Sequence, residues 1–270
     1  MTRDTGADFR ALHQKGNPFI LANAWDVGSA KMLAALGAEA IATSSAAHAF
    51  TLGRPDARVS RDEALTHAQD LVAAVNVPVS GDFENGFGAD PDTCAETVRL
   101  AAEIGLAGIS IEDTDLPGAA PYEFDLAVER IRAAAAAARA LKGDFVLVAR
   151  ADGLMLSSYN LEDALQRLAA FEAAGADCLY APLPANMDDQ ARICAATALP
   201  VNALAAGPFT KVSRAEFAAA GVARISLGSA LARATHRVIY DAAKAMFDHG
   251  DFSPLGHGIS GDVIDDLLMR

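Results

Sequence analysis

The sequence contains few cysteine residues, and none of them stands where a metal-binding motif would require it. Cys94, Cys178 and Cys194 are scattered along the 270 residues, with no CxxC pair and no histidines at zinc spacing. Isolated thiols of this kind are typical of proteins in a reducing compartment. We therefore expect a cytoplasmic location.

The chain also lacks basic clusters and long apolar runs. Acidic residues outnumber basic ones 35 to 22, which gives a formal net charge of -13, and no basic cluster offers a path for a phosphate backbone. No run approaches the ~18 apolar residues that a membrane span needs, and the polar segment after Met1 has no apolar core of a signal peptide. We expect neither a nucleic-acid partner nor a membrane association.

What the sequence does contain is a repeated pattern of an apolar strand, a polar tip and a helix. The expected strands begin near residues 19, 40, 77, 108, 145, 178, 200 and 224. Eight units in 270 residues give 270/8, or about 34 residues each, which is close to the size of one βα repeat. Alternating strands and helices of this number predict an α/β fold, the (β/α)8 TIM barrel.

The series is not interrupted by a linker rich in Pro, Gly or Ser, so residues 1–270 are predicted to form a single barrel domain. A short amphipathic helix is expected around Val263 to Leu268, in the tail that begins at Asp251. We expect this tail to dock on its own chain or on a neighbouring subunit.

Polar residues follow most of the expected strands. In a TIM barrel the chemistry lies at the carboxyl ends of the strands, so these residues are predicted to form one rim. They are Trp25 and Asp26, Ser44 and Ser45, Asp82 and Glu84, Glu112 and Asp113, Arg150 and Asp152, with Asn202 within the seventh strand.

The most distinctive stretch runs over residues 79–88 and reads Val-Ser-Gly-Asp-Phe-Glu-Asn-Gly-Phe-Gly. Asp82 and Glu84 leave a strand end on the same side, and Glu112 converges on them from the next strand. Three carboxylates in a partly desolvated cleft repel one another unless a cation lies between them. Oxygen ligands favour Mg²⁺ or Mn²⁺ over zinc. The alternative is that these acids cap helices or pair with Lys and Arg.

Candidate substrate-binding residues lie on the same rim. Arg150 could hold a substrate carboxylate through two parallel hydrogen bonds, with an ion pair to a rim acid as the alternative. Ser44 and Ser45 could donate hydroxyl and backbone N–H groups to the same anion, or cap a helix. Trp25, the one tryptophan, is expected to wall the pocket, and Asn202 to contact the substrate.

Other signals are weak. Gly228-Ser229 resembles a phosphate-binding corner, whereas no Gly-rich phosphate loop or dinucleotide fingerprint is present. No lysine occupies a predicted strand tip, which argues against a Schiff-base aldolase. His48 is expected to be a solvated loop histidine.

Several of these motifs together resemble the isocitrate lyase and phosphoenolpyruvate mutase superfamily. The resemblance covers almost the whole chain, and no single motif carries it. The motifs are Asn23-Ala24-Trp25-Asp26, Thr43-Ser44-Ser45, Gly53-Arg54-Pro55-Asp56, Asp82-Phe83-Glu84-Asn85-Gly86-Phe87-Gly88, Ile111-Glu112-Asp113, Ala149-Arg150-Ala151-Asp152 and the segment 221–228.

This resemblance implies a Mg²⁺-dependent enzyme that makes or breaks a C–C or P–C bond of a small 2-oxo or 2-hydroxy acid. It implies that Asp82 is the direct metal ligand, with Asp56, Glu84 and Glu112 acting through metal-bound water. Arg150 and the Ser44-Ser45 backbone would hold the carboxylate, and the metal and Arg150 would stabilise an enolate. It also implies a homo-oligomer, a dimer or tetramer, in which the last barrel helix is exchanged between subunits.

The chain departs from this family in one loop. Lyases of the family carry a Lys-Cys-Gly-His-type loop after the fourth strand, and mutases carry an Asn-Ser pair there, whereas residues 114–121 read Thr-Asp-Leu-Pro-Gly-Ala-Ala-Pro. We therefore expect an oxaloacetate-type decarboxylase or a related hydrolase. The alternatives are a 2-methylisocitrate lyase-like enzyme with a proton donor other than cysteine, a phosphonopyruvate hydrolase or mutase, and an inactive 2-oxo acid binding protein. An unrelated phosphosugar isomerase is a minor alternative.

Overall fold

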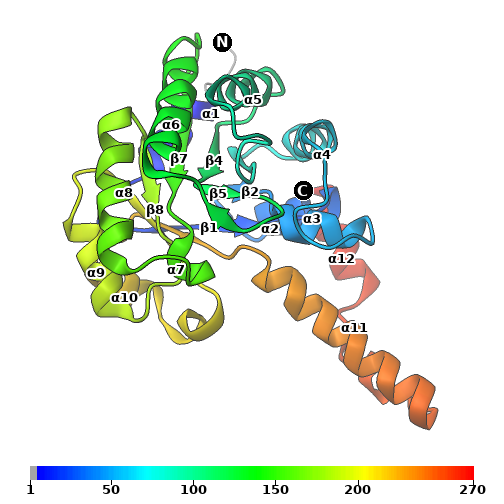
Figure 1. The fold of residues 1–270 in the computed structure, drawn as a ribbon. Helices are drawn as coiled ribbons and strands as arrows, with labels where there is room; N and C mark the ends of the chain where they lie inside the picture. Colours follow the sequence, from blue (N-terminus) through cyan, green and yellow to red (C-terminus); the bar gives the residue numbers. More distant parts are fainter. Residues whose placement is uncertain (1–4) are drawn as a thin grey trace.

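A computed structural model describes residues 5–270 and contains a closed barrel of parallel strands (Figure 1). The strands follow one another around the barrel in the order β1-β10-β9-β8-β7-β4-β3-β2, so the last strand closes onto the first. Their bounds are β1 Phe19–Asn23, β2 Ala40–Ala42, β3 Val79–Asp82, β4 Gly108–Glu112, β7 Val146–Arg150, β8 Cys178–Tyr180, β9 Val201–Leu204 and β10 Arg224–Ser226. The predicted TIM barrel is confirmed.

Helices follow each strand, as the repeated pattern predicts. Their bounds are α1 Thr5–Leu12, α2 Val27–Ala35, α3 Ser45–Thr51, α4 Arg61–Ala74, α5 Pro91–Glu103, α6 Phe124–Arg139, α7 Gly153–Leu156, α8 Leu161–Ala174, α9 Met187–Ala195, α10 Arg214–Ala219, α11 Ala230–His249 and α12 Gly261–Met269. Short elements complete the chain: the hairpin β5 Thr114–Asp115 with β6 Ala120–Pro121, and the 3-10 turns η1 Gly207–Lys211 and η2 Ser253–His257. Ser60 and Glu63 form a capping box that begins α4.

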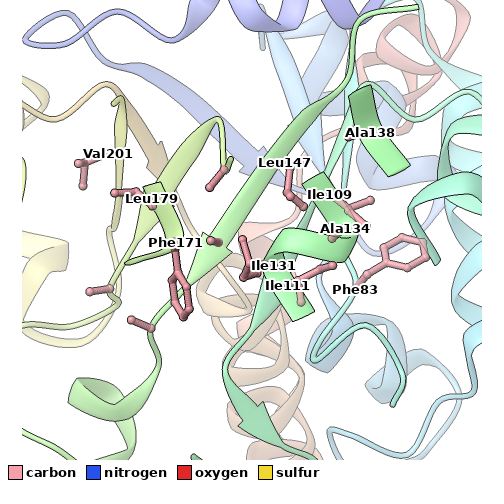
Figure 2. Close-up of a cluster of buried hydrophobic side chains, with 14 of the residues drawn as sticks. Phe83, Ile109, Ile111, Ile131, Ala134, Ala138, Leu147, Phe171, Leu179 and Val201 are labelled. Carbon is pink, nitrogen blue, oxygen red and sulfur yellow. The ribbon is translucent and has the colours of Figure 1, made fainter. Parts of the chain in front are cut away.

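The main hydrophobic core lies between the strands and the surrounding helices. Ile109, Ile111 and Leu147 leave β4 and β7 on the outer face and pack against Ile131 and Ala134 of α6 (Figure 2). The alanine-rich sequence of α6 lets the helix lie close to the sheet, since small side chains leave little space between backbones. This packing fixes β4 and β7, whose ends carry Glu112 and Arg150.

A second cluster closes the amino-terminal end of the barrel. Phe9 of α1 is fully buried and packs with Phe19, Val146 and Cys178, which point into the barrel. α1 therefore acts as a plug beneath the strands, and the barrel opens at the opposite end.

The helix after the last strand does not complete the ring of helices. α11 projects away from the barrel (Figure 1) and mainly contacts η2. Its apolar residues Val238, Ile239 and Phe247 are exposed. Ile20, whose side chain points outward from β1, is 45% exposed, because no helix of the described chain covers it.

The tail returns to its own chain. α12 packs on α2, and its Leu267 is buried, so the predicted tail helix is confirmed and is slightly longer than expected. Among the helices of residues 5–270, none is long and apolar enough to cross a membrane. The expectation for the first residues concerns Met1–Asp4, which lie outside the described part of the chain.

Candidate functional site

A cavity of about 780 Å³ lies at the carboxyl end of the barrel strands. It lies where a TIM barrel carries its active site. Its lining includes Asp56 and much of the predicted rim, namely Ser44, Ser45, Asp82, Glu112, Arg150 and Asp152. Residues from strands far apart in the sequence therefore meet around one space.

Arg150, at the end of β7, is the centre of the charged network. Its Nη1 lies 2.9 Å from Oδ1 of Asp82 and 2.7 Å from Oε1 of Glu112. Its Nη2 and Nε donate to the two carboxylate oxygens of Asp152, at 2.9 and 3.2 Å. The guanidinium also lies over the ring of Tyr180, 5.1 Å from the ring centroid, so its position is fixed on every side.

Burial and mutual repulsion decide the protonation of these groups. Burial disfavours the charge of Arg150, whereas Asp152 and Glu112 raise the pKa of its guanidinium well above the usual range. Burial also raises the pKa of Glu112 well above its ordinary value, although Arg150 opposes the shift. One guanidinium thus faces three carboxyl groups, and the charges of Asp152 and Asp82 add to the upward shift of the Glu112 pKa.

Asp82, at the end of β3, is held by the segment that follows β2. Its Oδ2 accepts hydrogen bonds from the backbone N–H and the hydroxyl of Ser45, at 3.0 and 3.1 Å. The hydroxyl of Ser44 accepts a hydrogen bond from the N–H of Ala47 and caps α3. The two serines therefore differ: Ser44 begins a helix, and Ser45 contacts the acid.

Glu84 follows Asp82 in a tightly turned segment. Glu84, Gly86 and Phe87 all have positive φ, a conformation that costs of order 1–3 kcal/mol for a residue other than glycine and that clusters at functional sites. The buried Arg130 holds this turn through the carbonyl oxygens of Asn85 and Gly88. The chain is thus held in a strained shape next to the acids.

Glu84 is 6% exposed and lies near the charges of Asp82 and Asp56. Burial, together with the charges of Asp82 and Asp56, raises the pKa of Glu84 to about 8. Partial burial and then Asp82 also raise the pKa of Asp56, whose carboxylate accepts a hydrogen bond from the N–H of Ala57 at 2.9 Å. Each of these shifts is one that a bound cation would reverse.

The acids are not yet gathered around one point. Within residues 5–270, no three His, Cys, Asp or Glu side chains are arranged as ligands of a single ion. Asp82 and Glu112 meet at Nη1 of Arg150 instead, and Glu84 lines a separate cavity of about 10 Å³ together with Asp82. The chemistry of the donor set suits a hard cation, since every side chain offers carboxylate oxygen.

Other predicted site residues do not line the large cavity. Asp113 accepts hydrogen bonds from Tyr159 and from the backbone N–H of Asp152, and pairs with Arg167, so it supports the rim from behind. The backbone N–H of Trp25 donates a hydrogen bond to the hydroxyl of Ser29. Asn202 is fully buried beneath the rim, where its amide donates to Ser226 at 2.8 Å.

Sequence reasoning missed residues that face the cavity from below the rim. Tyr180, Arg224 and Ser226 all line it. Strand alternation was the available signal, because Tyr180 shares the inward face of its strand with Cys178. His48 was expected in a solvated loop, but it lies in α3 and stacks on His67 with ring centroids 3.7 Å apart. Both of its ring nitrogens are buried without a hydrogen-bond partner.

Comparison with known proteins agrees with this fold and site. A family model described as phosphoenolpyruvate phosphomutase matches residues 9–247. A candidate lyase/mutase structure from Burkholderia cenocepacia J2315 has a TM-score of 0.94 and 44% identity, covering 98% of this chain and 96% of that one. A structure of oxaloacetate acetylhydrolase in complex with its product oxalate has a TM-score of 0.86 and 25% identity, covering 98% and 94%.

Sequence relatives point in the same direction. An uncharacterized protein of Mycobacterium tuberculosis (strain ATCC 25618 / H37Rv) is 34% identical over 242 residues, 89% of each chain. An oxaloacetate decarboxylase of Rhodopseudomonas palustris (strain BisB18) is 33% identical over 208 residues, 74% of this chain and 70% of the relative. The chain belongs to the phosphoenolpyruvate phosphomutase family, within the isocitrate lyase and phosphoenolpyruvate mutase superfamily of lyases and mutases.

Proposed function

We propose that this protein is a Mg²⁺-dependent enzyme that cleaves a C–C bond of a small 2-oxo acid, as an oxaloacetate-type decarboxylase or a related hydrolase. The observation that carries the proposal is the meeting of Asp82, Glu112 and Arg150 in one cavity, at 2.9 and 2.7 Å from a shared guanidinium nitrogen. Carboxylates and a fixed cationic group side by side suit a reaction in which negative charge develops on the substrate.

The carboxylates are the proposed metal site. Asp82 would be the direct ligand, and Asp56, Glu84 and Glu112 would hold the ion through water. The raised pKa of Glu84, about 8, supports this assignment, because burial and the charges of Asp82 and Asp56 cause it. A bound Mg²⁺ would supply positive charge next to the oxygen of the developing enolate.

The protein's own groups would bind and orient the substrate. Arg150 is held rigidly by Asp152 and the Tyr180 ring, and its Nη1 faces the cavity side where Asp82 and Glu112 lie. The backbone N–H of Ser45 is a second donor at the same place. Both donors are positioned before the substrate arrives, which lowers the cost of reorganisation.

The loop after β4 favours decarboxylation or hydrolysis over the other reactions of the family. The β5–β6 hairpin contributes the apolar Leu116 to the cavity, and residues 114–121 contain neither cysteine nor histidine. When CO₂ is the leaving group, it takes no proton from the protein at the moment of bond cleavage. A lyase, in contrast, needs an acid or base in this loop. A named oxaloacetate decarboxylase and an oxaloacetate acetylhydrolase among the similar proteins support this choice.

A substrate panel tests the proposal. Oxaloacetate, 2-methylisocitrate and phosphonopyruvate would each be incubated with the protein and Mg²⁺, and pyruvate, oxalate, succinate and phosphate would be measured. Pyruvate without succinate or phosphate indicates decarboxylation of oxaloacetate, and oxalate indicates hydrolysis. Oxalate binding without turnover of any compound would instead identify a binding protein. Turnover that persists in excess EDTA would contradict the proposed metal dependence.

We further propose that α11 is exchanged between subunits of a homo-oligomer. The exposed apolar side of α11 and the uncovered Ile20 on β1 are complementary features of one chain. A second copy that placed its α11 over Ile20 would complete the helical ring and bury both surfaces.

A further inference from the structure

The barrel interior below the rim is unusually open. TIM barrels normally fill this layer with bulky branched side chains. Here the inward-facing positions include Ala42, Ser80, Ser110 and Ser226, and all four line the large cavity. The cavity therefore continues from the rim into the barrel, as a shaft walled by small and polar side chains.

Arg224, the first residue of β10, lines this shaft and is 3% exposed. Its Nε donates to Oδ1 of Asn202 at 2.9 Å. Its Nη1 is buried without a hydrogen-bond partner, and within residues 5–270 no carboxylate forms an ion pair with it. A guanidinium in this position has lost its water and gained only one hydrogen bond in return.

Arg130, a buried guanidinium with a structural role, is bonded more fully than Arg224, although its Nε is also buried without a hydrogen-bond partner. Arg130 is fully buried and donates to the carbonyl oxygens of Glu112, Asn85 and Gly88. Its guanidinium also stacks on Tyr122 at 4.1 Å. Arg224 has no comparable set of acceptors, so its surroundings do not explain why a charged residue is kept there.

A buried charge without a partner is strongly unfavourable, and proteins retain one where a ligand supplies the opposite charge. We propose that Arg224 is a second anion-binding position, which holds the far carboxylate of a dicarboxylic substrate whose other end lies at the rim. The hydroxyl of Ser226 lines the shaft beside it and donates weakly to the carbonyl oxygen of Ala203, at 3.4 Å. This inference rests on the proposed function only in placing the other end of the substrate at the rim.

The register of the strands places the two arginines on one wall at different depths. Arg150 pairs with Tyr180, Tyr180 with Asn202, and Asn202 with Arg224 along neighbouring strands. Strands lie ~4.8 Å apart and tilt by ~36° in such barrels, so three strand steps descend on the order of 8 Å along the axis. Arg150 therefore serves the rim, and Arg224 serves the end of the shaft.

The charges at the two depths differ. Asp82, Glu112 and Asp152 already neutralise Arg150. Below it, burial lowers the pKa of the Arg224 guanidinium. Burial and then Arg224 lower the pKa of His13 to about 3, so that ring stays neutral and adds no charge of its own. The floor of the shaft consequently offers an anion a buried cation that has no carboxylate partner among residues 5–270.

Calorimetric titration with dicarboxylates tests the proposal. Oxalate, malonate, succinate and glutarate, which lengthen by one methylene group per step, would be titrated in Mg²⁺ into the wild type, Arg224→Met and Arg99→Met. Arg99 is an exposed residue of α5 outside the cavity, so its variant is a control for the loss of one positive charge. Arg224→Met is expected to bind the preferred longer acid about tenfold to a hundredfold more weakly and oxalate unchanged.

Equal weakening of oxalate and of the longer acids, or no weakening of either, would overturn the role of Arg224 while leaving the proposed function intact. If Arg224→Met does not fold, Arg224→Lys gives the same comparison with a smaller expected loss. If the wild type fails to bind oxalate, the result contradicts the proposed function. The anion-binding role of Arg224 is then tested separately, by soaking a crystal in bromide. Anomalous density at Arg224 supports it, whereas an ordered water between Arg224 and His13 overturns it.

Discussion

Nη1 of Arg150 lies 2.9 Å from Oδ1 of Asp82, and the side chains of the two residues are 11% and 17% exposed. This ion pair joins β7 to β3 across the neighbouring strand β4. The guanidinium thus compensates acids that would otherwise repel one another within a partly buried space.

The first prediction follows from this compensation. Arg150→Met leaves Asp82, Glu112 and Asp152 without their cation, and breaking a buried pair on one side typically costs ~3–5 kcal/mol. We expect a loss of this order in the free energy of unfolding, measured by urea denaturation without metal. Addition of Mg²⁺ is expected to restore part of it. An unchanged unfolding midpoint would show that the acids do not depend on Arg150.

Asp82→Asn tests the proposed direct metal ligand. The amide keeps the size of the side chain and can still accept the hydrogen bond from the N–H of Ser45, so the fold is expected to persist. Turnover of the 2-oxo acid is expected to fall by about 10²-fold or more, since a charged group at the reacting centre is lost. Asp92→Asn, in the exposed first turn of α5, is the matched control and is expected to keep full activity.

The raised pKa of Glu84 predicts a pH dependence of metal binding. In the folded protein without metal, Glu84 keeps its proton up to about pH 8, so Mg²⁺ must displace that proton below this pH. We expect the increase in Tm on adding Mg²⁺ to grow from pH 6 to pH 8 and then level off. Glu84→Gln is expected to remove most of this growth, and an identical pH profile for the variant would refute the assignment.

The stacked pair of His48 and His67 predicts a separate pH effect on stability. Burial, and then the neighbouring His48, lower the pKa of His67 to about 4, against 6.5 in the unfolded chain. The unfolded chain therefore binds a proton first as pH falls. The contribution of His67 is complete above pH 6.5 and is lost between pH 6.5 and 4.

His67→Gln isolates this contribution. We expect the urea midpoint of the variant to fall less steeply between pH 6.5 and 4 than that of the wild type. His257→Gln, at an exposed histidine of η2, is the control and should follow the wild type. Parallel curves for His67→Gln and the wild type would contradict the predicted effect.

The exposed face of α11 predicts a subunit interface. Ile239→Glu and Phe247→Glu place charges on a surface that the exchanged helix would bury, so light scattering is expected to show monomers at concentrations where the wild type is a dimer or tetramer. Lys244→Glu changes an exposed polar residue of the same helix and is expected to keep the assembly. A monomeric wild type would refute the exchange.

The sequence predicts the barrel well because each βα unit carries its own local signals. The Ser60 and Glu63 capping box, for example, depends on residues only three apart, and it begins α4. α3 (Ser45–Thr51) was not predicted, because His48 within it was expected to lie in a loop after the second strand. The two serines of that segment differ in role only through the position of Asp82, which comes from another strand.

The floor of the cavity could not be predicted in this way. Arg224 looks like the start of an ordinary strand, and its environment depends on the register of β10 with β9 and β1. Asn202 was expected at the rim, but the stagger of the strands around the closed barrel lowers it and places it beside Arg224. Such depth is a property of the whole ring, which no local pattern encodes.

The small side chains at Ala42, Ser80, Ser110 and Ser226 have a mechanical consequence as well. Unfolding abolishes internal void volume, and hydrostatic pressure favours the state of smaller volume. A barrel with an open shaft is therefore expected to be more sensitive to pressure than one whose interior is filled. A ligand that occupies the shaft would remove part of that void, so resistance to pressure would report how deeply it enters the barrel.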